Sequence, residues 1–424
     1  MEIDKIEESV DKLRKPKRRG HAVRKRTIVM VMALLIGALM ITATAGLLTY
    51  YGKIETTVNV EQSLRLDKMV YSTGYDDITI NNDVGNIAAG CCKWGDCHDL
   101  HLHSQACDPI SVKISSVVSP TDGGLTTMIA AEVQGAGVDC SDYTVPSGTV
   151  SVIDASNLVA KAADGAKETL IVKNGVVGST VISSGGDTIV AKNYLGVTLQ
   201  AGIHIASDGT TVKGFRIKPG NPAAGGGTEG IYLDNYKDIV IECNDIDGTG
   251  VTGQTIGIET LKGATGYSNI VIKNNKIHDL RTGIYTNPHT GTIDIEHNYF
   301  KDCTAGIGGA CGANVEYNVF DWDGEALGLD DGMSTRNLVA KHNNFYGDAA
   351  VNNYGTIGQN ALNNWWDCDG IDISGNVNAG WNTWAHDDVI TLEPNETVHF
   401  MIQYCTLGNA FGSYTSTVKF LPHT

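Results

Sequence analysis

Basic residues are scarce in most of this 424-residue sequence. Residues 1–27 hold ten of the 31 lysines and arginines and five of the 48 acidic residues, a local charge of +5, whereas the rest of the chain carries −22. Nucleic-acid binding requires clustered lysine and arginine side chains that neutralise phosphates. The main body of the chain is therefore excluded as a nucleic-acid-binding protein, and its acidic balance suits cation binding or solubility.

Charged residues are absent from positions 28–48, an apolar run about as long as the roughly 20 residues that a helix needs to cross a bilayer. The basic cluster before the run places residues 1–27 in the cytoplasm and the C-terminal bulk outside. The sequence thus predicts a transmembrane helix, or uncleaved signal anchor, over residues 28–51 of a single-pass cell-membrane protein. The alternative is a secretory signal cleaved near Ala45, which would release the protein from the membrane or leave it in filaments.

Cysteine is absent before position 91, so all ten cysteines follow the apolar run, as expected where an oxidising exterior preserves disulfides. The densest group lies in a loop at residues 91–107 and consists of Cys91, Cys92, Cys97, His98, His101, His103 and Cys107. Thiolates and imidazoles at this spacing suit zinc or copper, and Cys92-x4-Cys97-His98 is a stretched form of the haem attachment pattern. The sequence favours disulfides among Cys91, Cys92, Cys97 and Cys107 over a metal site, and either over haem.

Helical periodicity is absent beyond about residue 170, where the unit apolar-x-x-Asn-x-apolar recurs instead. The copies are IVKNGV, VAKNYL, IECNDI, IKNNKI, IEHNYF, VEYNVF and AKHNNF, with VKGFRI as a variant, and successive markers are 19 to 31 residues apart. This spacing predicts a solenoid in which each repeat is one rung. Asparagine suits the turn between strands because it bonds to nearby backbone and tolerates the left-handed conformation. We expect a structural ladder of Asn244, Asn275, Asn298, Asn318 and Asn343, and a helix over residues 154–165 that caps the first rung.

The repeats, with GVTLQAGIHIASDGTTVKGFRI and NNWW, resemble the NosD-type, pectate-lyase-like family over about residues 150–370. The resemblance implies a right-handed parallel β-helix. It does not fix a function, because that family includes lyases, hydrolases, epimerases and noncatalytic surface proteins.

The flanks of the solenoid alternate apolar and polar residues. The alternation in residues 388–424 predicts a closing β-hairpin. A lone hairpin is marginally stable and needs partner strands, and residues 54–145 contain four strand-like runs that could supply them. We expect one β-sandwich made of both flanks. The motifs TTVNV, GYDDITINND and PNETVHF…GSYTSTVKF resemble TasA/camelysin-like surface proteins, and this resemblance implies self-assembly by strand exchange.

Acidic residues gather in the segment DWDGEALGLDDG. Asp321, Asp323 and Glu325 are candidate calcium ligands, because calcium is bound by oxygen atoms. Asp330 and Asp331 are candidates for general acid and base in sugar cleavage, since LDDGMSTRNLV resembles the DDG region of polygalacturonase-like β-helices. The Gly-His motif of those enzymes is absent. Asn395 begins a glycosylation sequon, Asn395-Glu396-Thr397.

The sequence therefore predicts an all-β protein with one N-terminal transmembrane helix. Because no complete catalytic set is present, we expect a noncatalytic structural or adhesive protein at the cell surface, which binds polysaccharide or forms part of an extracellular filament. The alternative is a surface polysaccharide lyase or glycoside hydrolase of the β-helix type.

Overall fold

The computed structural model describes most of the chain from residue 64 onward. The described residues are 64–67, 79–82, 87–95, 100–119, 121, 123–220, 228–261, 267–287, 291–309, 312–322, 324–329, 338–347, 349–353, 359–366, 373–374, 377–408 and 414–423. Within these ranges no helix is long and apolar enough to cross a membrane. The predicted span at residues 28–51 and the basic segment before it lie outside them.

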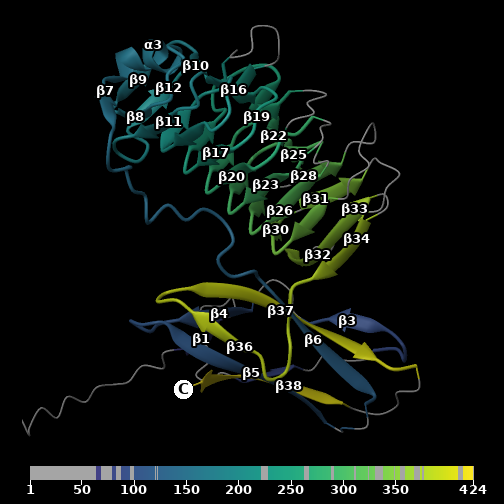
Figure 1. Ribbon diagram of the computed structural model, residues 1–424. Helices are drawn as coiled ribbons and strands as arrows, with labels where there is room; N and C mark the ends of the chain where they lie inside the picture. Colours follow the sequence, from purple (N-terminus) through teal and green to yellow (C-terminus); the bar gives the residue numbers. More distant parts are fainter. Residues whose placement is uncertain are drawn as a thin grey trace, which may run out of the picture. The chain divides into compact units, whose positions relative to one another are not determined.

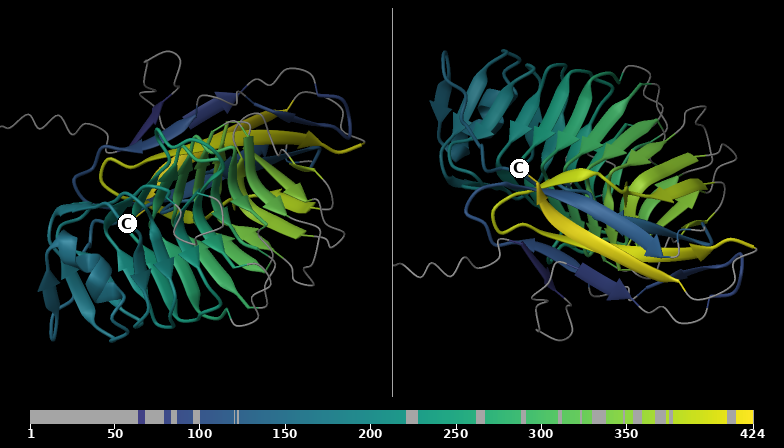
Figure 2. Two further views of the ribbon diagram at one scale, coloured as in Figure 1. Left: turned by 90° about the horizontal axis from the view of Figure 1, so that it is seen from above. Right: turned by 90° about the horizontal axis from the view of Figure 1, so that it is seen from below.

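A solenoid of parallel strands occupies the middle of the chain, and most rungs contribute one strand to each of three sheets, S1, S2 and S3 (Figures 1 and 2). Sheet S1 consists of β7 (Ser151–Ile153), β8 (Thr169–Val172), β11 (Thr188–Ala191), β14 (Thr211–Lys213), β17 (Ile239–Glu242), β20 (Ile270–Lys273), β23 (Ile293–Glu296), β26 (Ala313–Glu316), β29 (Val339–Lys341), β32 (Gln359–Trp366) and β34 (Val377–Trp381). Sheet S2 consists of β9 (Gly175–Val177), β12 (Val197–Leu199), β15 (Phe215–Ile217), β18 (Asp245–Asp247), β21 (Lys276–His278), β24 (Tyr299–Lys301), β27 (Val319–Asp321) and β30 (Asn344–Tyr346). Sheet S3 consists of β10 (Val181–Ser183), β13 (Ile203–Ile205), β16 (Thr228–Leu233), β19 (Thr255–Thr260), β22 (Thr282–Tyr285), β25 (Ala305–Gly308), β28 (Gly324–Leu329), β31 (Ala349–Asn353) and β33 (Ile373–Ser374).

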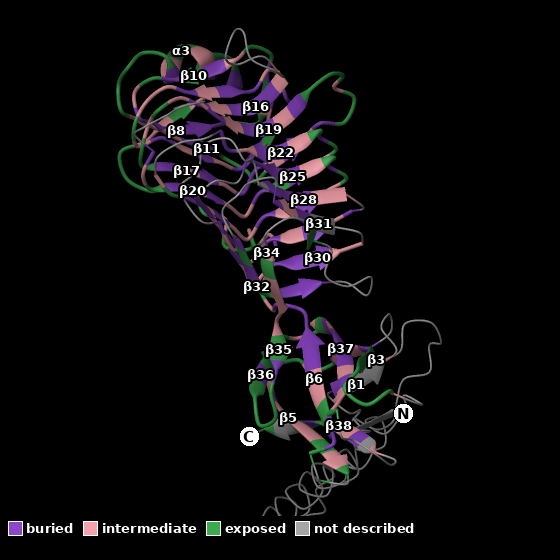
Figure 3. Cartoon of the chain, turned by 90° about the vertical axis from the view of Figure 1, so that its right-hand side faces the viewer, coloured by how far each residue is buried: buried purple, intermediate pink, exposed green. Residues whose placement is uncertain are grey.

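The interior of the solenoid is filled by side chains that repeat from rung to rung. Ile239 and Ile241 of β17 are buried, as are their in-register partners Ile270 and Ile272 of β20. The same alternation of buried and half-exposed residues runs along the solenoid strands (Figure 3). In the later rungs the core becomes an aromatic stack, with ring centroids 4.9 Å apart from Phe300 to Phe320, 5.0 Å from Phe320 to Phe345 and 4.4 Å from Phe345 to Trp366. Stacked apolar columns of this kind are what the repeated apolar positions of the motif produce.

The motif asparagines form one buried column at the turn between S1 and S2. Its members are Asn244, Asn275, Asn298, Asn318, Asn343 and Asn364. Asn298 is typical: its backbone N–H and its Nδ2 both donate to Oδ1 of Asn318, at 2.9 and 3.0 Å, and its Nδ2 also donates to the carbonyl of Ile272. The column begins beyond Phe215, and Asn193 and Asn174 bond to each other separately at an exposed position.

The left-handed residue in each of these turns is the one before the ladder asparagine. Those residues are Cys243, Asn274, His297, Tyr317, His342 and Asn363, with φ between 54 and 58°. Our expectation that the ladder asparagine itself takes the left-handed conformation is therefore wrong. The amide is selected for its hydrogen bonds along the column, because one side chain satisfies buried backbone groups on two rungs.

A short helical segment precedes the first full rung. It consists of η1 (Ala155–Asn157) and α3 (Leu158–Ala162), so it is shorter than the predicted helix over residues 154–165. Neither part has a side-chain cap hydrogen bond. Leu158 and Ala162 are buried in the solenoid core, which shows that the segment covers apolar side chains there.

Both flanks of the solenoid contribute strands to two antiparallel sheets. One sheet has the order β1 (Leu64–Asp67), β4 (His101–Ser104), β37 (Thr397–Thr406), β6 (Leu125–Ala131) and β35 (Thr383–Trp384), with β3 (Cys92–Trp94) also paired to β37. The other has the order β2 (Thr79–Asn82), β38 (Thr415–His423), β5 (Ile110–Ser119) and β36 (Val389–Leu392). The two sheets share one apolar core, in which the rings of Phe400 and Phe420 meet edge to face at 5.0 Å. The described strands thus make a β-sandwich that draws on both flanks.

The predicted closing hairpin is wrong in its pairing. Strand β37 pairs with β6, whereas β38 pairs with β5, so the two consecutive strands lie in different sheets. They face each other through buried side chains, as Phe400 and Phe420 do. An alternating pattern on both sides of a turn is satisfied equally by two strands side by side and by two strands facing across a core.

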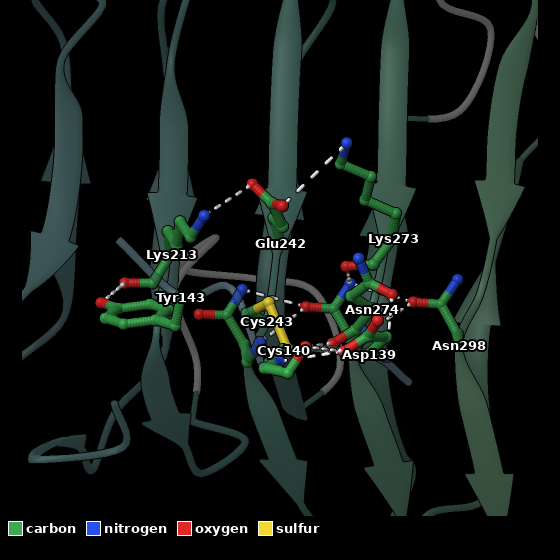
Figure 4. The surroundings of a disulfide bond; sticks show 12 residues. Asp139, Cys140, Tyr143, Lys213, Glu242, Cys243, Lys273, Asn274 and Asn298 are labelled. Atoms are coloured by element: carbon green, nitrogen blue, oxygen red, sulfur yellow. Dashed lines mark hydrogen bonds and ion pairs between the residues drawn. A yellow bond between two sulfur atoms is a disulfide. The ribbon is translucent and has the colours of Figure 1, made fainter. Parts of the chain in front are cut away.

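Residues 132–150, here called the strap, connect β6 of the sandwich to β7 of the first rung. Their contacts with the solenoid run from late rungs to early ones: the N–H of Gly137 donates to the carbonyl of Tyr317, the N–H of Asp139 to Oδ1 of Asn274, and the Tyr143 hydroxyl to the carbonyl of Ala191. Between them, Cys140 forms a disulfide with Cys243 (Figure 4). The strap therefore follows the solenoid back toward its beginning.

Candidate functional site

Four polar and aromatic side chains form a row on the outer face of S3. Parallel register pairs His204 with Tyr232, Tyr232 with Glu259, and Glu259 with Tyr285, so each side chain lies one strand from the next. All four are half-buried. Adjacent strands are about 4.8 Å apart, which spaces these groups regularly. We call His204, Tyr232, Glu259 and Tyr285 the outer row.

The strands of S3 place a second outward position close to this row. Gly230 and Ile231 are both buried, and a Cβ on Gly230 would lie only 2.7 Å from the carbonyl oxygen of Gly257 and 3.0 Å from Ile246 in the core. Because two consecutive residues face inward, the residues on either side of them, Glu229 and Tyr232, both lie toward the outer side.

Glu229 and Glu259 bring two carboxyl groups together at this place. Glu229 is 0% exposed, and neither of its carboxyl oxygens has a hydrogen-bond donor. Glu259 is half-buried and accepts one hydrogen bond, from Nδ2 of Asn287 at 3.1 Å. Burial, followed by the contact with Glu229, raises the pKa of Glu259 to about 7. The pair therefore holds a proton near neutral pH unless another positive charge replaces it.

An imidazole and a carboxylate form the other end of the outer row. Nε2 of His204 lies 2.7 Å from Oδ2 of Asp234, and its ring meets that of Tyr232 edge to face at 5.4 Å. Burial, and then the charges of Asp234, Glu259 and Glu229, raise the pKa of the Tyr232 phenol. Tyr232 consequently stays a neutral hydroxyl that can donate and accept hydrogen bonds.

Beyond Tyr285 the outer row continues as two glycines, Gly308 and Gly328. A Cβ on Gly308 would lie 2.9 Å from the ring of Tyr285, and one on Gly328 would lie 2.1 Å from Oε1 of Glu325. The absence of a side chain at these positions therefore gives the Tyr285 ring and the Glu325 carboxylate their space.

The cysteines of the Cys/His-rich segment do not form one site in the described structure. Cys92 forms a disulfide with Cys405 of β37, so the predicted pairing of Cys92 with a neighbour in residues 91–107 is wrong, and its sulfur is no metal-binding thiolate. Cys91 and Cys107 are exposed thiols. Cys97 and His98, including the haem-like pattern, lie outside the described residues.

The two histidines of β4 contact groups on β37. The ring centroid of His101 lies 4.0 Å from that of His399, and Nδ1 of His103 lies 2.8 Å from Oγ1 of Thr397. Thr397 is the hydroxyl residue of the sequon, and Asn395 itself is exposed in the turn before β37, with φ 62°.

The acidic segment is also only partly described. Asp321, at the end of β27, accepts hydrogen bonds from the Tyr299 hydroxyl and from Nζ of Lys301, and Glu325 of β28 accepts one from Nδ2 of Asn352. The two candidate calcium ligands therefore lie in different sheets, Asp321 in S2 and Glu325 in S3, and each has its own hydrogen-bond partner. Asp323, Asp330 and Asp331 lie outside the described residues, so their roles stay predictions.

Among the described residues, one other group brings three potential metal ligands within 4.8 Å of one another, namely Asp247, His278 and Asp279. Its carboxylates already have nitrogen-bearing side chains as partners. Nζ of Lys218 lies 2.6 Å from Asp247, and His278 is held by Asp245 at 2.9 Å and Asp279 at 2.6 Å. The hydrogen bond to Asp245 raises the pKa of His278, burial opposes it, and the hydrogen bond to Asp279 raises it further, so protonation of the imidazole is favoured in this group.

The outer row could not be predicted from the sequence because its members share no motif. Tyr232, Glu259 and Tyr285 are 26 to 27 residues apart and differ in chemical type. A repeat alignment anchored on the ladder asparagines would not align them either, because the number of residues between the asparagine and the S3 strand varies from rung to rung. The glycine–isoleucine pairs of S3 are the signal that could have found them.

The comparisons with known proteins concern the solenoid. Residues 201–378 match the family model "Right handed beta helix region". The search of curated proteins finds no match. Among solved structures, the chain is similar to the "Crystal structure of alginate lyase from Paenibacillus sp. str. FPU-7", with 16% identity and a TM-score of 0.38, covering 54% of this chain and 98% of that chain. This likeness is too low to carry a functional argument, and the finer resemblances to NosD-type and TasA/camelysin-like proteins stay predictions. The family match and the three parallel sheets together establish that the chain contains a right-handed parallel β-helix domain.

Proposed function

We propose that this is a noncatalytic surface protein that binds polysaccharide along the outer face of S3. The observation that carries the proposal is the outer row, in which aromatic rings and hydrogen-bonding groups alternate at the spacing of successive strands. Half-buried tyrosines offer an apolar ring and a polar hydroxyl to a sugar. Repetition of such groups along one face suits a chain-like ligand, because each rung adds one contact of the same kind.

The charge of the face favours uncharged glycans. The outward positions on the S3 strands around the row include the half-buried Glu259 and Glu325, and none of the described positions next to the row, such as Ile256, Thr282 and Ala305, is lysine or arginine. Carboxylates accept hydrogen bonds from sugar hydroxyls but repel the carboxylates of uronic acids. We therefore expect neutral polysaccharide to bind more tightly than polyuronate.

Attachment to the cell surface belongs to the same proposal. Two disulfides, Cys92–Cys405 and Cys140–Cys243, support an oxidising location for the domains that carry them. The apolar run over residues 28–51 would then hold the protein in the membrane. Strand exchange between copies, suggested by the TasA/camelysin-like flanks, would add a filament-forming role.

Binding is tested with full-length protein and a panel of neutral and uronic-acid polysaccharides, measured by affinity electrophoresis or calorimetry. We expect Tyr232→Ala and Tyr285→Ala each to weaken neutral-glycan binding on the order of tenfold, which corresponds to about 1.4 kcal/mol. Tyr194→Ala is the matched control, since Tyr194 is an exposed tyrosine outside the outer row. Equal binding by all three variants and the unmodified protein would refute the proposed face.

The same panel separates binding from cleavage. Release of oligosaccharides that disappears in Glu259→Gln would replace the binding proposal with a hydrolase or lyase that uses the carboxyl pair. Release that disappears only in Asp330→Asn or Asp331→Asn would instead support the catalytic residues predicted from the sequence.

A further inference from the structure

Glu229 is a buried carboxyl group whose oxygens lack donors. Its side chain is 0% exposed, and neither Oε1 nor Oε2 receives a hydrogen bond. An ionised carboxylate removed from water without a partner is strongly destabilised, so such a group is normally neutralised or held by a positive charge. The group that Glu229 contacts, however, is a second acceptor, the carboxyl of Glu259.

The contact between Glu229 and Glu259 requires something positive between them. Two carboxylates repel each other at close range, and the pair becomes favourable only when a proton or a cation is shared. Asn287 donates to Oε1 of Glu259, which leaves the other oxygens of the pair without an N–H or O–H donor among the described residues.

No basic side chain fills this place in the described part of S3. The strand neighbours of the pair are Tyr232, Ile256 and Tyr285, and His204 on the same sheet is hydrogen-bonded to Asp234 instead. The group around Asp247 is different, because Nζ of Lys218 lies 2.6 Å from Oδ2 of Asp247 and supplies a positive charge there. Of these two acidic groups, only the S3 pair is left without a cationic side chain.

We propose that Glu229 and Glu259 bind one divalent cation, and that this cation is calcium. The ligand atoms of the pair are carboxylate oxygens, which hard cations prefer, whereas zinc and copper favour imidazole and thiolate. A single ion also suits the burial of Glu229 better than a sugar ring, because it is far smaller. The site differs from the calcium site predicted at Asp321, Asp323 and Glu325, and it does not depend on the proposed polysaccharide.

Terbium luminescence tests the site directly, since Tb³⁺ replaces Ca²⁺ and is excited through nearby tyrosines. Tyr232 and Tyr285 lie on the strands that flank Glu259. We expect full-length protein, stripped with EGTA, to show tyrosine-sensitised Tb³⁺ emission that Ca²⁺ displaces. Glu229→Gln and Glu259→Gln should each reduce this emission at least tenfold. Tyr232→Phe combined with Tyr285→Phe should reduce emission while calorimetric Ca²⁺ binding persists.

Matched controls come from the same sheet and from the sequence-predicted site. Glu325 lies on β28 toward the outer side, as Glu229 does on β16, but it is bonded to Asn352. Glu325→Gln and Asp321→Asn should therefore leave Tb³⁺ emission unchanged. Emission that survives Glu229→Gln and Glu259→Gln overturns the proposal, and emission lost only in Glu325→Gln or Asp321→Asn assigns the cation to the other site.

A second measurement tests the site in the unmodified protein, so it does not depend on whether the variants fold. Saturating Ca²⁺ should raise the melting temperature of the unmodified, EGTA-treated protein, because a ligand that binds the folded state stabilises it. An unchanged melting temperature together with no Ca²⁺ heat in calorimetry overturns the proposal. Glycan affinity is measured separately, so a protein that binds glycan but no Ca²⁺ refutes this site alone.

Discussion

Cys140 of the strap is bonded to Cys243, the left-handed residue that precedes the first ladder asparagine. The two cysteines are 103 positions apart, so one covalent bond closes a loop that contains the first rungs of the solenoid. Lys213, Glu242 and Lys273 form ion pairs across the neighbouring S1 strands, and Tyr143 packs beneath Lys213 (Figure 4). The strap is thus held by a disulfide within a polar network.

Replacing both cysteines with serine should lower the free energy of unfolding. A disulfide that closes a loop of about 100 residues stabilises by about 2–5 kcal/mol, mainly because the unfolded chain is constrained. Urea unfolding of Cys140→Ser/Cys243→Ser checks this value. Cys107→Ser is the control, since Cys107 is an exposed thiol and its replacement should change stability by less than about 0.5 kcal/mol.

Asn298→Ala should destabilise the protein strongly. The substitution leaves the N–H of Asn275 without its acceptor and the carbonyl of Ile272 without its donor, both inside the buried column. At about 1–3 kcal/mol for each unsatisfied group, the expected loss is about 2–6 kcal/mol. Thermal unfolding measures it, with Asn193→Ala as control at an exposed asparagine pair. Equal effects of the two substitutions would contradict the ladder as a stabilising element.

The carboxyl pair should make calcium-free protein less stable as pH rises from about 4.5 to 7. The pKa of Glu259 is raised from 4.5 to about 7, so the folded protein binds this proton more tightly than the unfolded chain does. Its stabilising contribution is therefore complete below pH 4.5 and is lost as pH rises through about 7. Urea unfolding in EGTA across this range checks the sign, and Glu259→Gln should flatten the slope. Carboxyls with lowered pKa, such as Asp247 at about 2, act below this window.

Peptide mapping of protein alkylated before digestion should find Cys92 linked to Cys405. Cys91 and Cys107 should carry the alkylating label, because both are exposed thiols. A linkage of Cys92 to Cys107 would instead restore the pairing within residues 91–107 that the sequence favours. Treatment of the intact protein at low pH limits disulfide exchange from the neighbouring Cys91 thiol.

The rungs of the solenoid could be predicted because one short motif fixes them. An apolar strand, an asparagine and a second apolar residue recur, and their chemistry repeats at each turn between S1 and S2. The sequence could not show which residue of that turn is left-handed and which forms the ladder, because asparagine suits both positions. Asparagine occupies the left-handed position before a ladder asparagine only at Asn274 and Asn363.

Strand pairing in the sandwich was harder to predict than the strands themselves. The alternation of Phe400, Ile402 and Tyr404 indicates a strand with one face buried, but it carries no information about which strand lies beside it. The Glu229–Glu259 contact is likewise invisible in the sequence. It arises because residues 30 positions apart are placed on neighbouring strands by the rung length.

The strap and strand β35 also determine how the chain would carry tension. The chain leaves the sandwich after β6 and returns in β35, and these two strands pair directly, with Trp384 opposite Ile129. A pull between residue 79 and the C-terminal strand acts on β2 and β38, which pair antiparallel within the sandwich. The hydrogen bonds between sandwich strands therefore bear the load. The solenoid lies outside the path of the force, so its rungs stay stacked while the protein is stretched.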